Sequence, residues 1–109
     1  MNGKPKRVYV SGPMTGYDDL NYPAFQMAAT QLRALGYTVI SPHEINPQEG
    51  VCYEDCMRAD IAALLLCDAI ALLPGHEKSK GAAIETAIGK VLNMKIGLYS
   101  EFCCEPEAV

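Results

Sequence analysis

The chain has 109 residues, half of them hydrophobic and a fifth charged, which suits one globular domain spanning 1–109 and is too short for two. Its formal net charge is −4 and its basic residues gather only at Lys4–Arg7, so we expect no polymeric nucleic acid partner. No apolar segment reaches the roughly 18 residues of a membrane span, so we expect no membrane partner. No secretory signal is visible, and the five cysteines cannot all pair in one chain, so we expect a reducing, cytoplasmic location.

The first half of the chain alternates strand and helix patterns. Arg7–Ser11 is β-branched and aromatic and predicts a strand that ends in the segment SGPMTG. Asn21 is predicted to cap a helix that Gly36 ends. The apolar residues of this helix recur at helical spacing: Phe25, Ala28, Leu32 and Leu35. Tyr37–Ser41 predicts a second strand, and Pro42–Val51 predicts a loop.

The second half repeats the alternation. Tyr53–Leu66 predicts a helix, and the continuous apolar run Asp68–Leu73 predicts a central parallel strand. A third helix is expected from position 79 or 80 to about 93, and Lys95–Ser100 predicts a fourth strand. The acidic, cysteine-bearing tail that follows predicts no element.

This order predicts an α/β fold, a flavodoxin-like or Rossmann-like three-layer sandwich. Its parallel sheet should have four or five strands in the order 2-1-3-4(-5). Such sheets bind ligands beyond the carboxyl ends of the strands, at the switch point between strands one and three. The segments SGPMTG and PGHEKS meet there, together with the start of the third helix. We therefore expect these residues to contact the ligand: Ser11, Gly12, Pro13, Met14, Gly16, Gly75, Ser79 and Gly81.

Two carboxylates interrupt the apolar faces of predicted helices. Glu85 shares a face with Ile88, and Asp60 shares one with Leu64. Burying an unpaired carboxylate costs several kcal/mol, so each is either a flanking residue that reaches solvent or a functional group inside the pocket. Tyr9 lies mid-strand, and an inward Glu85 is a candidate partner for its hydroxyl. Two inward carboxylates at one cleft are the arrangement that glycosidic-bond chemistry uses.

Ser79 allows two interpretations. Its hydroxyl can cap the third helix, or it can hold a phosphate together with the helix N–H groups.

For metals, the candidate ligands are Cys52, Cys56, the Cys103–Cys104 pair, and His43 or His76. Their spacing is not that of a zinc finger or ribbon, so we expect no metal and no other cofactor.

Three segments carry a family resemblance: VYVSGPMTG, YxxCMRADIAALLLCDAIALLPG and SKGAAIETAIGKVLNMKI. Together they resemble the nucleoside 2-deoxyribosyltransferase-like superfamily over Val8 to about Leu98. The likeness is strongest to a branch of short bacterial and phage proteins, near the nucleoside 5′-monophosphate N-glycosidases. The most specific piece is the motif S-x-G-A-x-x-E at the start of a helix.

The resemblance implies roles for four residues. In the superfamily the motif glutamate attacks C1′ of a nucleoside or nucleotide, expels the base and forms a glycosyl–enzyme ester, which a second base or water then resolves. Glu85 would be this nucleophile, Tyr9 would hydrogen-bond it, and Asp60 would help the departing base. Gly12 matches a glycine of the first ligand loop.

Position 79 separates two branches of the superfamily. Transferases of free nucleosides usually carry an acidic residue six positions before the glutamate, whereas hydrolases of nucleoside 5′-monophosphates carry a serine that touches phosphate. Ser79 resembles the second group and favours a phosphorylated ligand. The first loop reads PMT and lacks the arginine of those hydrolases, so Lys78, Lys80 or a neighbouring subunit would have to supply the cation.

Two classes of function follow. The first is an enzyme, an N-glycosidase or deoxyribosyltransferase acting on a small nucleotide or nucleoside, with Glu85, Asp60 and Tyr9 converging. The second is a module that captures a nucleotide-derived ligand without turning it over, which the missing arginine and the plain loop Pro42–Val51 favour.

We also expect a homodimer or homotetramer, because the core is small, the segment IAALLL is apolar, and relatives complete their sites with a neighbouring subunit.

Overall fold

The computed structural model describes residues 7–45 and 52–104. Within these ranges four strands form one parallel sheet in the order β2-β1-β3-β4. The strands are β1 (Arg7–Ser11), β2 (Thr38–Ile40), β3 (Ala69–Leu72) and β4 (Lys95–Leu98). The predicted α/β class and the order 2-1-3-4 are confirmed, and the described residues contribute no fifth strand.

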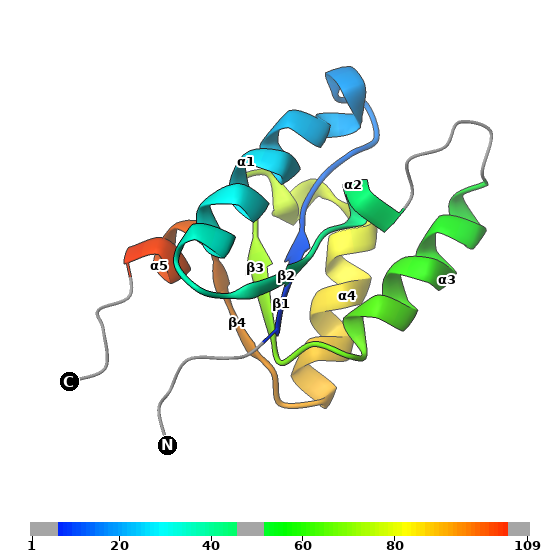
Figure 1. Cartoon of the computed structure of the whole chain (residues 1–109). Helices are drawn as coiled ribbons and strands as arrows, with labels where there is room; N and C mark the ends of the chain where they lie inside the picture. The colour runs from blue at the N-terminus through cyan, green and yellow to red at the C-terminus, as the bar shows by residue number, and fades with distance from the viewer. Residues whose placement is uncertain (1–6, 46–51, 105–109) are drawn as a thin grey trace.

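Helices cover both faces of the sheet, which gives the predicted three layers (Figure 1). α1 (Tyr22–Ala34) and α5 (Tyr99–Cys104) pack on one face, and α3 (Tyr53–Leu64) and α4 (Lys80–Val91) pack on the other. The one-turn helix α2 (Pro42–Ile45) follows β2 and contacts both α1 and α3. No helix in the described ranges has both the length and the apolar character needed to cross a membrane.

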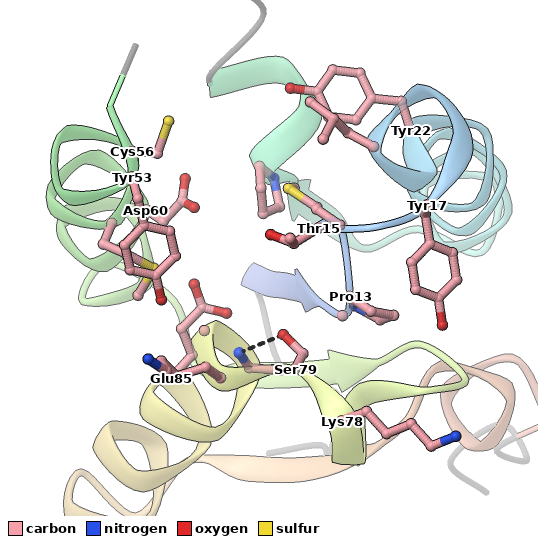
Figure 2. Close-up of a pocket in the computed structure, with 18 residues that line it drawn as sticks. Pro13, Thr15, Tyr17, Tyr22, Tyr53, Cys56, Asp60, Lys78, Ser79 and Glu85 are labelled. Carbon is pink, nitrogen blue, oxygen red and sulfur yellow. Dashed lines mark hydrogen bonds between the residues drawn. The ribbon is translucent and has the colours of Figure 1, made fainter.

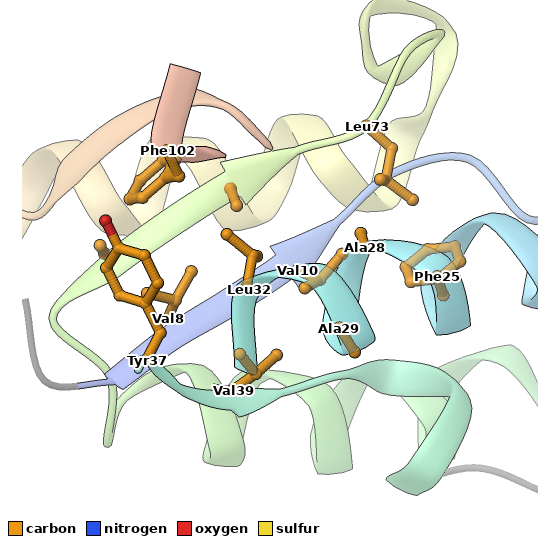
Figure 3. Close-up of a cluster of buried hydrophobic side chains, with 12 residues drawn as sticks. Val8, Val10, Phe25, Ala28, Ala29, Leu32, Tyr37, Val39, Leu73 and Phe102 are labelled. Atoms are coloured by element: carbon orange, nitrogen blue, oxygen red, sulfur yellow. The ribbon is translucent and has the colours of Figure 1, made fainter. Parts of the chain in front are cut away.

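β1 sends alternate side chains into two separate cores. Val8 and Val10 pack against α1, in the cluster that Figure 3 shows. Tyr9 lies in the second cluster, on the side of α3 and α4, together with Ile70 of β3. Because side chains alternate along a strand, Ser11 faces the same side as Tyr9. The pleat of β1 thus directs two hydroxyls toward α4.

The core on the α1 side is completed by α5. Its first two residues, Tyr99 and Ser100, were predicted to end the fourth strand, and its other residues belong to the tail for which the sequence predicted no element. α5 places Phe102 in this core, with its ring centroid 6.0 Å from that of Tyr37 (Figure 3). A helix of six residues is too short to display a hydrophobic period, which explains why the pattern did not reveal it. Positions 105–109 of the tail, like positions 4–6 of the basic cluster, lie outside the described residues.

Two local predictions are corrected. The predicted loop Pro42–Val51 begins with α2, in which the N–H of Glu44 donates to the carbonyl of Ser41 at 3.0 Å; positions 46–51 lie outside the described residues. Asn21 precedes α1 but makes no side-chain capping bond. Its backbone is left-handed, with φ of 62°, and its Nδ2 donates a 2.9 Å hydrogen bond to the carbonyl of Pro13. Asparagine tolerates this conformation, and here it ties the loop after β1 to the start of α1.

Candidate active site

A pocket of about 800 Å³ opens at the carboxyl ends of the strands. Its walls are the loop after β1, the start of α2, one face of α3 and the start of α4 (Figure 2). This is the switch point between β1 and β3, where open α/β sheets bind ligands. The sequence predicted the site at this end of the sheet.

Glu85 of α4 lines this pocket and is only 4% exposed. Both of its carboxylate oxygens accept hydrogen bonds from β1. The Tyr9 hydroxyl donates to Oε2 at 2.8 Å, and the Ser11 hydroxyl donates to Oε1 at 2.6 Å. Glu85 is therefore not the solvated flanking residue that the sequence left open, and the suggested contact with Tyr9 is present.

The small residues of α4 bring Glu85 within reach of β1. Ala82 and Gly89 are buried on the same face, one turn before and one turn after the glutamate. A Cβ on Gly89 would lie 2.6 Å from Cδ1 of Ile70, so glycine is what lets the helix approach the sheet this closely. The side chain of Glu85 then spans the short remaining gap to the two hydroxyls.

Burial dominates the electrostatics of Glu85 and raises its pKa from 4.5 to about 7. The hydrogen bonds from Ser11 and Tyr9 lower the pKa and oppose this effect, whereas the nearby charge of Asp60 raises it further. Burial, followed by the charge of Glu85, raises the pKa of Tyr9 far above its usual 10. Tyr9 therefore keeps its proton and acts as a donor.

Asp60 of α3 reaches the same pocket and is 6% exposed. Figure 2 shows its side chain and that of Glu85 directed into the cavity from two different helices. The pKa of Tyr22, on the facing wall, is raised by burial, by a neighbouring thiol and by the charge of Asp60, in that order of size. The structure thus brings two carboxylates from distant parts of the sequence to one cavity.

Ser79 caps α4, as one of the two interpretations predicted. Its Oγ accepts a 3.1 Å hydrogen bond from the backbone N–H of Ala82, drawn as the dashed line in Figure 2. In this bond the oxygen is the acceptor, so the hydroxyl hydrogen remains able to donate to a ligand. The N–H groups of Lys80 and Gly81 lie in the first turn, where a helix offers them no carbonyl. All three residues line the pocket.

The structure separates the predicted site residues into three groups. Five of them line the pocket together with Glu85 and Asp60: Gly12, Pro13, Met14, Ser79 and Gly81. Ser11 and Tyr9 are fully buried beneath it, bonded to Glu85. Gly16 and Gly75 are not among the lining residues.

Two of the predicted glycines have a packing role. A Cβ on Gly12 would lie 2.7 Å from Cβ of Leu73, so this glycine allows the end of β1 to pass β3. Gly75 has a φ of +87°, and a Cβ there would lie 2.8 Å from the hydroxyl of Tyr17. These packing contacts account for glycine at both positions, and Gly12 also lines the pocket, where close approach to a ligand stays a prediction.

The apolar and aromatic walls of the pocket were not predicted from the sequence. They include Tyr17, Leu20, Tyr22, Pro42, Tyr53, Cys56 and Met57. The signal was available on α3, because Tyr53, Met57 and Asp60 follow one another at spacings of four and three and therefore share a face. A Cβ on Gly81 would lie 3.4 Å from Sδ of Met57 and 3.8 Å from the hydroxyl of Tyr53, so this face meets the start of α4.

Positive charge is sparse around the cavity. Among the described residues Lys78 and Lys80 line it, and no arginine does. In Figure 2 the side chain of Lys78 extends away from the two carboxylates. Within the described ranges, no three His, Cys, Asp or Glu side chains come together in a group that could hold a metal ion.

The solved structures that share this fold include the following three. A 2-deoxyribosyltransferase from Bacillus psychrosaccharolyticus is 24% identical, with a TM-score of 0.66, over 84% of this chain and 70% of that protein. A 2-deoxyribosyltransferase from Leishmania mexicana is 20% identical, with a TM-score of 0.66, over 84% of this chain and 62% of that protein. The CMP N-glycosidase of Clostridium botulinum is 21% identical, with a TM-score of 0.56, over 84% of this chain and 66% of that protein.

These comparisons establish the fold, and the matched region spans 62 to 70% of the length of the three proteins. No curated protein matches the sequence significantly. Residues 6–98, however, match a family described as "Domain of unknown function (DUF4406)". That range runs from β1 to the end of β4 and includes every residue found to line the pocket. The chain therefore belongs to the DUF4406 family.

Proposed function

We propose that this protein cleaves or transfers the N-glycosidic bond of a small nucleoside or nucleotide, through a glycosyl ester on Glu85. The observation that carries the proposal is a buried carboxylate, held by two hydroxyl donors, that shares a pocket with a second carboxylate. The three proteins of similar fold act on this class of molecule, as two 2-deoxyribosyltransferases and a CMP N-glycosidase. A cavity of about 800 Å³ is in the size range of small-molecule sites.

In the first step, a carboxylate oxygen of Glu85 bonds to C1′ while the bond from C1′ to the base nitrogen breaks. The electron pair of that bond leaves with the base. The transition state resembles an oxocarbenium ion, which an adjacent carboxylate stabilises before capturing it. This step requires ionised Glu85, and a pKa of about 7 leaves a large fraction ionised at neutral pH.

Asp60 is proposed to donate a proton in the first step and to accept one in the second. As an acid it protonates the departing base, which makes the base a better leaving group. In the second step, water or another base attacks C1′, the ester bond breaks, and the carboxylate of Glu85 is restored. When water is the acceptor, its proton passes to Asp60, which returns the site to its starting state.

We further propose that the ligand carries a 5′-phosphate at the start of α4. The hydroxyl of Ser79 and the N–H groups of Lys80 and Gly81 would donate to it, where the helix dipole favours an anion. No arginine lines the described part of the pocket, so Lys78 and Lys80, which do line it, are the candidate cations.

One observation favours a second candidate, a module that binds a nucleotide-derived ligand without turnover. The sparse positive charge and the tyrosines on the walls suit stacking and retention of a base more than strong phosphate binding. The same pocket would serve, and only turnover separates the two proposals.

Product analysis tests the proposal. The protein is incubated with nucleosides, nucleoside 5′-monophosphates and dinucleotides such as NAD, and free base is measured by chromatography. Glu85→Gln should lower base release by about 10³-fold or more. Glu77→Gln is the matched control, because Glu77 has a side chain 72% exposed and is not a lining residue. It should keep the native rate.

Three outcomes are decisive. Base release that depends on Glu85, with a sugar adduct found by mass spectrometry on the peptide containing Glu85, supports the enzyme. Tight binding of one ligand by calorimetry with no base released supports the binding module. Base release at the native rate by Glu85→Gln contradicts the role of Glu85 as nucleophile.

A further inference from the structure

Ser11 occupies an unexpected place at the edge of the pocket. It is the last residue of β1, directly before the loop that forms a pocket wall. Its side chain is 0% exposed and does not line the pocket, so it is not placed to contact a ligand as the sequence suggested. Its hydroxyl donates instead to Oε1 of Glu85.

The bond from Ser11 has the geometry of a charge-assisted hydrogen bond. Its length is 2.6 Å, and hydroxyl-to-carboxylate bonds of about 2.5–2.7 Å are typical when the acceptor is ionised. The bond from Tyr9 to the other oxygen is 2.8 Å. Because the two donors stand two residues apart on one face of β1, each carboxylate oxygen receives one of them.

The strand that carries these donors is held rigidly. β1 is an inner strand of the sheet, and its register places Tyr9 beside Ile70 and Ser11 beside Leu72. Donors on a paired strand keep their positions more closely than donors on a loop. The lone pairs of Glu85 that the two hydroxyls leave free are then presented to the pocket, which Glu85 lines.

We propose that Ser11 is a positioning residue, which together with Tyr9 holds the carboxylate of Glu85 ionised and in one orientation toward the pocket. Burial and the neighbouring Asp60 of α3 both favour the protonated acid, and the two hydroxyls of β1 oppose them. Among the described residues, Lys78 and Lys80 are the cations that line the same pocket, and the side chain of Lys78 extends away from Glu85 (Figure 2). Removing the Ser11 hydroxyl therefore shifts Glu85 toward its neutral form.

The consequence for turnover rests on the proposed function, whereas the effect on Glu85 itself does not. A neutral Glu85 cannot attack C1′, so loss of the Ser11 hydroxyl should reduce the rate relative to that of the native protein at neutral pH, and the two rates should converge as the pH rises. A residue with a merely structural role would lower the rate equally at every pH.

The experiment measures the titration of Glu85 directly. The protein is labelled with ¹³C at the glutamate carboxyl carbons, and the Glu85 resonance is assigned by its loss in Glu85→Gln. In Ser11→Ala its midpoint should rise by about one pH unit or more, because a hydrogen bond to a charged group contributes that much. Ser41→Ala is the matched control. Ser41 is an equally buried serine bonded to His43 rather than to Glu85, and its loss should leave the midpoint unchanged.

A second variant keeps the test independent of one substitution. Ser11→Cys replaces the hydroxyl with a larger and weaker donor and should give a midpoint between those of the native protein and Ser11→Ala. Circular dichroism verifies that each variant is folded. A midpoint unchanged from the native value in the folded Ser11 variants would overturn the proposal. A raised midpoint in a protein that releases no base would support the positioning role and contradict only the proposed activity.

Discussion

The hydroxyl of Tyr9 lies 2.8 Å from Oε2 of Glu85, although 76 residues separate them in the chain. One belongs to an inner strand and the other to the helix that packs on it, so the contact forms only when the sheet and α4 are assembled. Burial keeps the tyrosine protonated and therefore a donor. The hydrogen bonding of Glu85 thus depends on the packing of α4 against the sheet.

The first prediction concerns stability and pH. Glu85 has a pKa of about 7 in the folded protein and an ordinary value of 4.5, so between these pH values the folded state binds more protons than the unfolded state. Its contribution to the free energy of unfolding is therefore lost as pH rises from about 4.5 to 7, by up to about 3 kcal/mol. Urea titrations at pH 5 and pH 8 should show this loss in the native protein and a smaller one in Glu85→Gln. Glu77→Gln, at an exposed position, should behave as the native protein does, and equal losses in all three proteins would contradict the prediction.

Ser79→Ala is expected to separate a nucleotide from its nucleoside. A hydrogen bond to a charged group contributes about 1.5–3 kcal/mol, so affinity for a 5′-monophosphate should fall about tenfold or more, while affinity for the nucleoside hardly changes. Loss of the cap on Ala82 should also cost about 1 kcal/mol of stability. Calorimetry is therefore performed at a temperature at which both proteins are folded. Equal losses of affinity for the two ligands would mean that Ser79 acts only as a cap.

Gly12→Ala and Gly81→Ala should have opposite effects on stability. The new Cβ at position 12 would lie 2.7 Å from Cβ of buried Leu73, so overpacking should cost about 1–3 kcal/mol. At position 81 the nearest neighbour would be Sδ of Met57 at 3.4 Å, an ordinary contact, and alanine favours the helix by up to about 1 kcal/mol. Thermal melts compare the two variants with the native protein. A native melting temperature for Gly12→Ala would show that β1 and β3 can separate at this point without cost.

The fourth prediction is the oligomeric state. Leu65, Val91 and Leu92 are exposed at the ends of α3 and α4 and line a shallow apolar depression, and Val91 is 83% exposed. We propose this face as a contact of the expected homodimer or homotetramer, because covering it would remove apolar surface from water. Val91→Asp should then give the 11.8 kDa monomer by light scattering. Met27 is the matched control, because it is exposed on α1, which packs on the other face of the sheet. Met27→Asp should therefore leave the assembly intact. A native protein that is only monomeric at micromolar concentration and above would contradict the prediction.

The order of elements and their assembly into a sheet could be predicted from the sequence. Strands that alternate with amphipathic helices must be parallel, and right-handed crossovers leave few arrangements. The apolar run that became β3 was expected at the centre of the sheet, and all four of its residues are buried between two helical layers. Periodicity also placed Glu85 and Asp60 beside apolar residues of their helices, because that information is local to each helix, but it left open whether they reach solvent.

The tertiary structure alone decided what those carboxylates meet. Ser11 was expected to bind substrate, and it instead lies beneath the pocket as a donor to Glu85. Gly16 and Gly75 were expected beside the ligand, and the described pocket is lined by other residues of their loops. The physical reason is that a repeating pattern records which face of an element is buried, but not which element covers it or at what distance. Those distances depend on the register of β1 in the sheet and on how closely Gly89 lets α4 approach Ile70, which are contacts between residues far apart in the chain.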